Sequence, residues 1–142
     1  MVHLIIGQKG SGKTKRLVKL ASDALNNTNG NVVFIDDDTR CMPELNYRIR
    51  FINSTEYAVR SVEEIYGFIA GLLAGNYDIQ KIYIDGLYNV SSATYDEVAP
   101  FVKRLNKLCE NREVEIYMTL SETSGSLPAD LSEFIMEELK VE

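Results

Sequence analysis

Residues 2–14 read VHLIIGQKGSGKT, an apolar run that passes directly into a glycine-rich loop. The run over Val2–Ile6 is short, almost uncharged and rich in β-branched side chains, so it predicts a buried strand. The residues that follow, Gly12–Leu25, place apolar side chains three and four positions apart and predict an amphipathic helix. The loop therefore joins a buried strand to the start of a helix.

The loop itself, GQKGSGKT, matches GxxxxGK[ST] at every fixed position, which is the Walker A or P-loop pattern. Glycines allow backbone angles that turn successive N–H groups toward one centre, where the phosphates of a nucleotide are held. The positive end of the following helix dipole points at the same anion. The nucleotide-binding residues expected from this pattern are Gly7, Gln8, Lys9, Gly10, Ser11, Gly12, Lys13 and Thr14.

Two residues of the loop have further expected roles. Lys13 is expected to reach the β and γ phosphates and to assist catalysis there. Thr14 is expected to offer its hydroxyl oxygen to Mg²⁺, which bridges two phosphates. Lys9 is interpreted as a charge that faces either the phosphates or solvent.

The rest of the chain alternates strand and helix patterns. Strands are predicted over 31–36, 48–53, 81–85 and 114–120, and helices over 61–75, 96–110 and 128–140. Ser61 and Glu64 resemble a capping box at the start of one helix. This order predicts an α/β fold, a three-layer α/β/α sandwich with a mainly parallel sheet, formed by residues 1–142 as one domain.

Composition limits the classes of function. The net charge of -6 argues against a broad surface for nucleic acid. No apolar stretch is long enough to span a membrane, and no basic leader with an apolar region opens the chain, so a cytoplasmic protein is expected. Cys41 and Cys109 lack metal or redox spacing and are expected to be free thiols.

A nucleoside triphosphatase also needs a carboxylate at the end of a second buried strand, near the Mg²⁺. The stretch KIYID ends in Asp85, which is therefore the candidate metal residue beside Thr14. Many ATPases carry a glutamate directly after this aspartate, but here the next residue is Gly86. A group that positions the attacking water must therefore come from elsewhere or be absent.

Two further stretches, VVFIDDDTRCMP and KIYIDGLYNV, resemble segments of RecA-like ATPases within the P-loop nucleoside triphosphatase superfamily. The resemblance implies a compact RecA-like core that hydrolyses ATP with Mg²⁺. It places the catalytic glutamate position of that family on Asp38, a shorter carboxylate, and a polar sensor on Ser121 or Glu122. The alternative interpretation of DDDTR is a solvated turn after a strand.

The sequence is also compatible with other functions. The guanine-recognition pattern NKxD has no match in a suitable place, so ATP rather than GTP is the expected ligand. The missing glutamate after Asp85 also allows a regulatory or binding module that binds the nucleotide without hydrolysis. A small-molecule kinase is a third alternative, and the sequence leaves a homo-oligomer or a protein partner open.

Overall fold

Six parallel strands form one sheet, in the spatial order β3-β2-β4-β5-β1-β6. The computed structural model describes residues 1–141. The strands are β1 (Val2–Gly7), β2 (Asn31–Asp36), β3 (Arg50–Asn53), β4 (Ile79–Ile84), β5 (Glu115–Leu120) and β6 (Ile135–Leu139). The strand predicted over 48–53 is β3, and it lies at one edge of the sheet.

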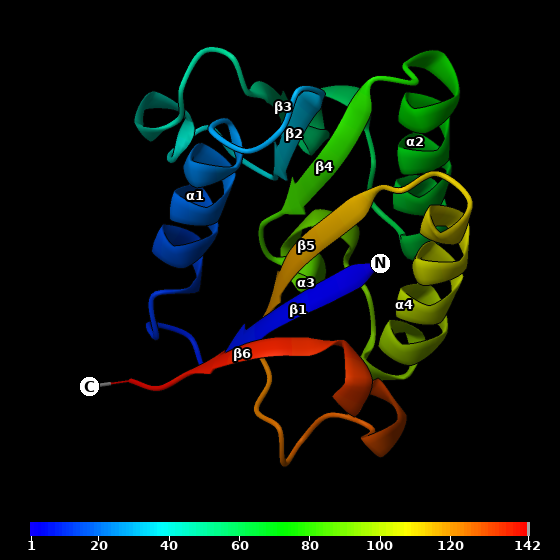
Figure 1. Cartoon of the computed structure of the whole chain (residues 1–142). Coiled ribbons are helices and arrows are strands. Elements are labelled where there is room, and N and C mark those ends of the chain that lie inside the picture. The colour runs from blue at the N-terminus through cyan, green and yellow to red at the C-terminus, as the bar shows by residue number, and fades with distance from the viewer. Residues whose placement is uncertain (142) are drawn as a thin grey trace.

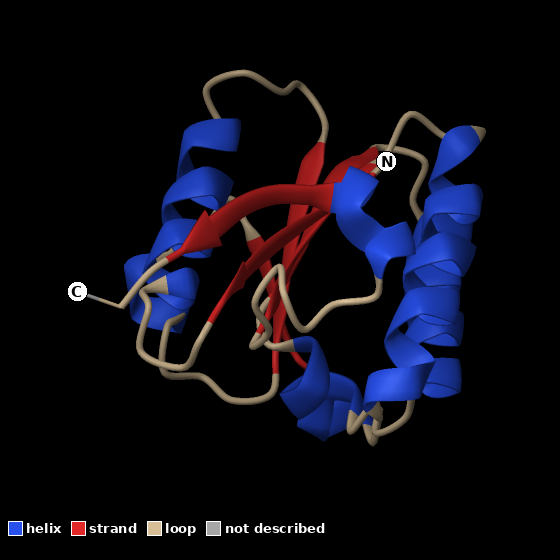
Figure 2. Ribbon diagram, turned by 90° about the horizontal axis from the view of Figure 1, so that it is seen from below, coloured by secondary structure: helices blue, strands red, loops and turns tan. Residues whose placement is uncertain are grey.

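Helices cover both faces of the sheet, which gives three layers (Figures 1 and 2). The α-helices are α1 (Lys13–Ala24), α2 (Val62–Gly75), α3 (Leu87–Ser91) and α4 (Tyr95–Glu110). Short 3₁₀ helices are η1 (Met42–Glu44), η2 (Ser54–Tyr57) and η3 (Ala129–Phe134). One face carries α1 and the other carries α2, α3 and α4 (Figure 1), so the predicted α/β/α fold is confirmed.

The two faces of the sheet bury two hydrophobic clusters. Successive side chains of a strand point to opposite faces, so Leu4 and Ile6 of β1 join the cluster beneath α2 and α4, whereas Ile5 joins the one beneath α1. Strands buried on both faces read as apolar runs, as most of β1 and β2 and the second half of β4 do. This packing makes the strands a rigid base for the loops at their ends.

The order of the strands determines which loops meet. Strand β5 lies between β1 and β4 and pairs with both of them in register. Because all strands are parallel, their carboxyl ends lie along one edge of the sheet, where α/β proteins of this type bind ligands. The loop after β1 and the carboxylates after β2 and β4 therefore share that edge.

The prediction of a helix over residues 128–140 is wrong. Residues 129–134 form η3, and residues 135–139 form β6, which pairs in parallel with β1 from Leu4↔Ile135 to Gly7↔Leu139. Leu131 and Phe134 face the core from η3, so the first part of the apolar spacing is used as predicted. The second part becomes a strand because it satisfies the N–H and C=O groups along the open edge of β1.

The ends of the other helices agree with the sequence in most places. Ser61 caps α2 by accepting a hydrogen bond from the Glu64 N–H at 3.1 Å, whereas the Glu64 carboxylate accepts from the Arg60 N–H rather than completing a capping box. A complete box instead opens α4 at Thr94 and Glu97. Helix α3 was not predicted. Within residues 1–141, no helix combines the length and the apolar character needed to cross a membrane.

Candidate functional site

The loop between β1 and α1 depends on its glycines at three places. Gly10 and Gly12 have φ angles of 85° and 92°, in the left-handed region that other residues avoid. At Gly7 a β-carbon would lie 2.7 Å from the Leu139 carbonyl oxygen and 2.5 Å from the Ser11 hydroxyl oxygen. The end of β6 thus packs against the start of the loop, and only glycine fits there.

The loop surrounds a concave surface at the start of α1. The first N–H groups of a helix have no partner within the helix, so those of Lys13 and Thr14 are available to an anion. The Lys13 ammonium donates a hydrogen bond to the Gln8 carbonyl oxygen at 3.0 Å, and burial lowers the pKa of Lys13. The Ser11 hydroxyl is buried and has no hydrogen-bond partner within residues 1–141.

Asp85, directly after β4, is the centre of a hydrogen-bonded group. One carboxylate oxygen accepts from the Thr14 hydroxyl and the other from the Thr119 hydroxyl, each at 2.8 Å. The Gly86 N–H in turn donates to the Thr119 oxygen at 2.6 Å. The first turn of α1 and the ends of β4 and β5 are therefore linked through one carboxylate, which is only 8% exposed.

The acidic turn after β2 places Asp36 inward. This side chain is 6% exposed. Its carboxylate accepts hydrogen bonds from the Asp37 N–H at 2.7 Å and from the Cys41 thiol at 3.4 Å. Burial raises the pKa of Asp36 to about 7, and the side-chain hydrogen bond with Asp37 and the nearby Asp85 charge add to the effect. Burial, followed by the contact with Asp36, raises the pKa of the Cys41 thiol to about 12, so this cysteine is an unreactive thiol.

Asp38 lies on the outer side of the same turn. Its carboxylate accepts from the Arg40 N–H at 2.9 Å and from the Arg40 guanidinium at 2.8 Å, and these hydrogen bonds lower the pKa of Asp38. The Arg40 side chain is 89% exposed. The carboxylate predicted to position water is therefore engaged by a neighbouring cation, while Asp36 is the more enclosed of the two groups.

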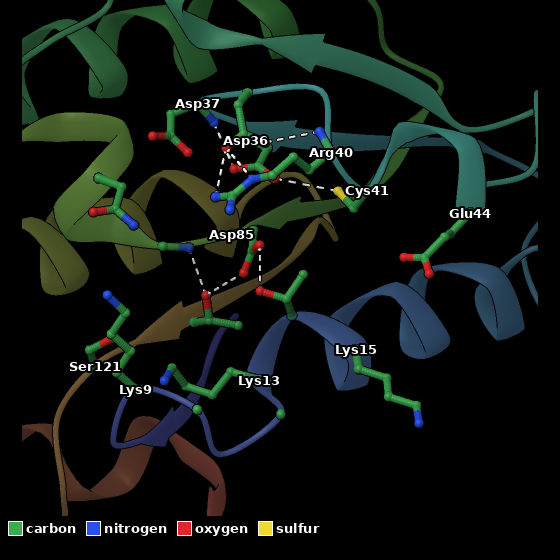
Figure 3. A pocket seen from close by; sticks show the side chains of 17 residues that line it. Lys9, Lys13, Lys15, Asp36, Asp37, Arg40, Cys41, Glu44, Asp85 and Ser121 are labelled. Atoms are coloured by element: carbon green, nitrogen blue, oxygen red, sulfur yellow. Dashed lines mark hydrogen bonds and ion pairs between the residues drawn. The ribbon is translucent and has the colours of Figure 1, made fainter.

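The loop and the acidic turn form opposite walls of a cleft of about 780 Å³ (Figure 3). Lys9 and Lys13 lie on the loop side, Asp36, Asp37 and Arg40 on the other side, and Asp85 between them (Figure 3). One wall is thus cationic and the other mainly anionic. A polyanion in this cleft needs a cation between it and the acidic wall.

The cleft brings together most of the residues predicted from the sequence. Those that line it are Lys9, Gly10, Gly12, Lys13, Thr14, Asp38, Asp85 and Ser121. Gly7, Gln8 and Ser11 belong to the loop but do not line the cleft, and Glu122 does not line it either.

Sequence reasoning missed Asp36, Thr119 and Asn89, which also line the cleft. Thr119 had a usable signal, because it is a single polar residue near the end of the apolar strand MTL. Asp36 had none, since three consecutive aspartates do not reveal which one faces inward. Asn89 lies on α3, the helix that the sequence did not predict.

Oxygen atoms dominate the centre of the site. The Thr14 hydroxyl and the Asp85 carboxylate are hard oxygen donors of the kind that Mg²⁺ prefers, and Mg²⁺ is usually held by one or two carboxylates together with phosphate oxygens. Within residues 1–141 there is no group of three or more His, Cys, Asp or Glu side chains that could hold a metal by themselves. The residues present fit a Mg²⁺ that arrives with a phosphate ligand.

Two solved structures share this fold. The flagellar accessory protein FlaH from Methanocaldococcus jannaschii is 18% identical, with a TM-score of 0.53, and the match covers 91% of this chain and 63% of that chain. PCH-2 from C. elegans is 15% identical, with a TM-score of 0.56, and the match covers 99% of this chain and 35% of that one. This chain therefore spans less than two thirds of either protein.

At these identities the likeness shows the fold alone. The all-parallel sheet with helices on both faces is consistent with a P-loop nucleoside triphosphatase or RecA-like fold. No protein-family model and no curated protein sequence matches the chain. The function proposed below therefore rests on the residues of the cleft.

Proposed function

We propose that this chain binds ATP together with Mg²⁺ in the cleft after β1 and hydrolyses it to ADP and phosphate. The observation that supports this most strongly is the 2.8 Å hydrogen bond between Thr14 and Asp85. It joins the last residue of the GxxxxGKT loop to the carboxylate at the end of β4, the two groups that a Walker-type site uses on one Mg²⁺.

The loop over residues 7–14 is proposed to bind the phosphates. The N–H groups around Gly10 and Gly12 and at the start of α1 supply fixed donors, and Lys13 supplies the mobile positive charge. The Lys13 contact with the Gln8 carbonyl keeps the ammonium beside the loop. A triphosphate oxygen offers this ammonium a charged acceptor in place of a neutral one, and such bonds are the stronger kind.

Thr14 and Asp85 are proposed to hold the Mg²⁺. Bound Mg²⁺ would neutralise charge on the phosphates, while the Thr14 oxygen and the Asp85 carboxylate fix its place. Thr119 is proposed to hold the Asp85 carboxylate in one orientation, because its hydroxyl donates to Asp85 and accepts from the Gly86 N–H. The cation would also separate the phosphates from the acidic turn.

Positioning of the attacking water is assigned to the acidic turn. The sequence indicates Asp38, and this role requires its carboxylate to leave the Arg40 guanidinium. Within residues 1–141, Asp36 has no guanidinium to leave: its carboxylate accepts from the Asp37 N–H and the Cys41 thiol, and it lies enclosed on the wall opposite Lys13. We therefore propose Asp36 first and Asp38 second for this step.

One observation favours a second function, a module that binds ATP and does not turn it over. The residue after Asp85 is Gly86, with a φ of 78°, so no carboxylate follows the metal-binding aspartate. In that case the nucleotide would act as a ligand that changes the protein's binding to a partner.

Phosphate release separates the two functions. We expect the wild-type protein to release phosphate from ATP with Mg²⁺ and not with EDTA, and Lys13→Ala to abolish this release. Lys15→Ala is the matched control, because Lys15 also lines the cleft but points away from Asp85 (Figure 3). Tight ATP binding without release above the Lys13→Ala background would reject the ATPase and leave the binding module.

A further inference from the structure

Arg40 carries the positive charge of the acidic wall of the nucleotide cleft. It follows β2, shortly after Asp38, and lies on the wall opposite Lys13 (Figure 3). The loop and the first turn of α1 supply the cationic side chains Lys9, Lys13 and Lys15. A ligand in this cleft therefore meets positive charge from both sides.

One oxygen of the Asp38 carboxylate holds the Arg40 guanidinium. The Nε and Nη2 atoms of Arg40 both lie 2.8 Å from Asp38 Oδ2. Asp38 Oδ1 accepts from the main-chain N–H of Arg40 instead, so the pair lacks the parallel bonds to both oxygens that make arginine–carboxylate contacts strong. Within residues 1–141 the remaining guanidinium nitrogen, Nη1, has no hydrogen-bond partner. The guanidinium is therefore held in place and still has free donors.

This ion pair is weak because water reaches it. The Arg40 side chain is 89% exposed and that of Asp38 is 35% exposed. Exposed ion pairs contribute little to stability, since water solvates both charges and the pair restricts two side chains. The hydrogen bond and charge of Asp38 raise the pKa of Arg40, and the Asp36 and Asp37 charges add to this effect. Arg40 can therefore exchange Asp38 for a ligand at small cost and remain beside the acidic turn.

A third phosphate would be a stronger partner for this guanidinium than Asp38 is. In loops of the GxxxxGKT type the backbone N–H groups surround the inner phosphates and the lysine reaches the outer ones. The third phosphate of a nucleotide bound in this way would lie between Lys13 and the wall that carries Arg40. It offers Arg40 several charged oxygens, which suit paired hydrogen bonds, whereas Asp38 offers the guanidinium a single oxygen.

The same exchange removes a repulsion. A phosphate that approaches the acidic turn meets the carboxylates of Asp36, Asp37 and Asp38. A guanidinium between the phosphate and these carboxylates attracts both. A diphosphate ends on the loop side of the cleft and gains nothing from it, so the effect of Arg40 is specific to the triphosphate.

We infer that Arg40 makes the cleft selective for a nucleoside triphosphate over the diphosphate, because its guanidinium leaves Asp38 and binds the third phosphate. This inference rests on the nucleotide binding proposed above, and it applies whether the chain hydrolyses ATP or only binds it. In an ATPase, Arg40 holds the phosphoryl group that is transferred to water. In a binding module, Arg40 distinguishes the ATP-bound from the ADP-bound protein.

Calorimetric titration in Mg²⁺ tests this selectivity, with ADP and with an ATP analogue whose β–γ bridge is an imido group that resists hydrolysis. We expect Arg40→Gln to weaken binding of the analogue about tenfold or more and to change ADP binding by less than about twofold, because a charge-assisted contact is lost from the third phosphate alone. Arg40→Lys should give an intermediate loss, since it keeps the charge and lacks the planar fork. Arg48→Gln, at an exposed arginine that does not line the cleft, is the matched control and should change neither affinity.

Asp38→Asn tests the release of Arg40 from its partner. Affinity for the analogue should change by less than about threefold, because the exposed pair contributes little. A loss as large as that of Arg40→Gln would show that the two side chains must stay paired, and it would overturn the exchange. Thermal unfolding of each variant checks that the chain is intact.

The preference for the analogue over ADP decides the role of Arg40. Equal losses for the two ligands in Arg40→Gln, or an unchanged preference, would overturn the selectivity and leave the nucleotide site in place. A wild type that binds neither ligand would overturn the proposed nucleotide binding, and the role of Arg40 with it.

Discussion

The two walls of the nucleotide cleft are built in different ways. The loop over residues 7–14 obtains its shape from glycine φ angles and from the close packing of Gly7 against Leu139. The turn over residues 36–40 obtains its chemistry from side chains, of which Asp36 is enclosed and Asp38 is bound to Arg40. The loop is shaped by its backbone, so it can be recognised from the glycine positions in the sequence. The turn acts through its side chains, so its role depends on which aspartate faces inward.

The acidic turn provides the largest expected effect. Asp36→Asn should lower the single-turnover rate at saturating ATP and Mg²⁺ by about 100-fold or more, the usual effect of removing a group that acts on the attacking water. Asp38→Asn should lower it by less than about tenfold, because Asp38 is engaged by Arg40. ATP affinity should stay similar in both.

The opposite order of effects would give the two aspartates the opposite roles. A large loss in Asp38→Asn with a small one in Asp36→Asn would assign the water to Asp38, as the sequence indicates. Equal, small losses in both variants would remove the acidic turn from the reaction.

Thr119 lies between the two walls, beside Asp85, and its replacement should have a smaller effect than the replacement of Asp36. Thr119→Val removes the hydroxyl that donates to Asp85 and accepts from Gly86, with little change in shape. The Mg²⁺ concentration needed for half-maximal ATP binding should rise about tenfold, as for other groups that orient metal ligands. Thr123→Val, in the loop after β5, is the control. A lower unfolding temperature with unchanged Mg²⁺ dependence would show that Thr119 is only structural.

The smallest expected effect concerns stability and pH. The pKa of Asp36 is about 7 in the folded protein and 3.8 is its ordinary value, so between these pH values the folded state binds more protons than the unfolded state. The contribution of Asp36 to the free energy of unfolding therefore falls as pH rises from about 4 to 7.

Asp36→Asn removes this contribution. In metal-free buffer, urea unfolding should show the variant gaining stability relative to the wild type by roughly 1 to 4 kcal/mol between pH 4 and pH 8. Asp37→Asn, at a more exposed position of the same turn, is the control. The same difference in stability at both pH values would contradict the enclosed, proton-retaining Asp36.

The sequence was sufficient for the fold class and for placing the GxxxxGKT loop and Asp85 at one edge of the sheet. Buried parallel strands and the GxxxxGKT loop follow from local patterns, and Asp85 follows because it ends an apolar strand. These features need no knowledge of distant contacts, since apolar runs and the glycine pattern can be recognised within a few residues.

Features that depend on distant contacts were not predictable. Residues 135–139 have helical spacing but form β6, because the open edge of β1 is 128 residues or more away in sequence and supplies their hydrogen bonds. Asp36 is inward because β2 carries it to the strand end beside Asp85, and its pKa responds to that charge. Thr119 acquires its partners only when β5 enters between β1 and β4.

Calorimetric titration with ATP, in Mg²⁺ and in EDTA, tests directly whether this cleft binds the nucleotide, with Lys13→Ala and Lys15→Ala measured beside the wild-type protein. We expect one ATP per chain, tighter binding with Mg²⁺, a loss of about 10- to 100-fold in affinity for Lys13→Ala, and little change for Lys15→Ala, since a charge-assisted hydrogen bond contributes about 1.5 to 3 kcal/mol. Binding of ATP that is equally strong in Lys13→Ala and independent of Mg²⁺ would contradict a nucleotide site in this cleft.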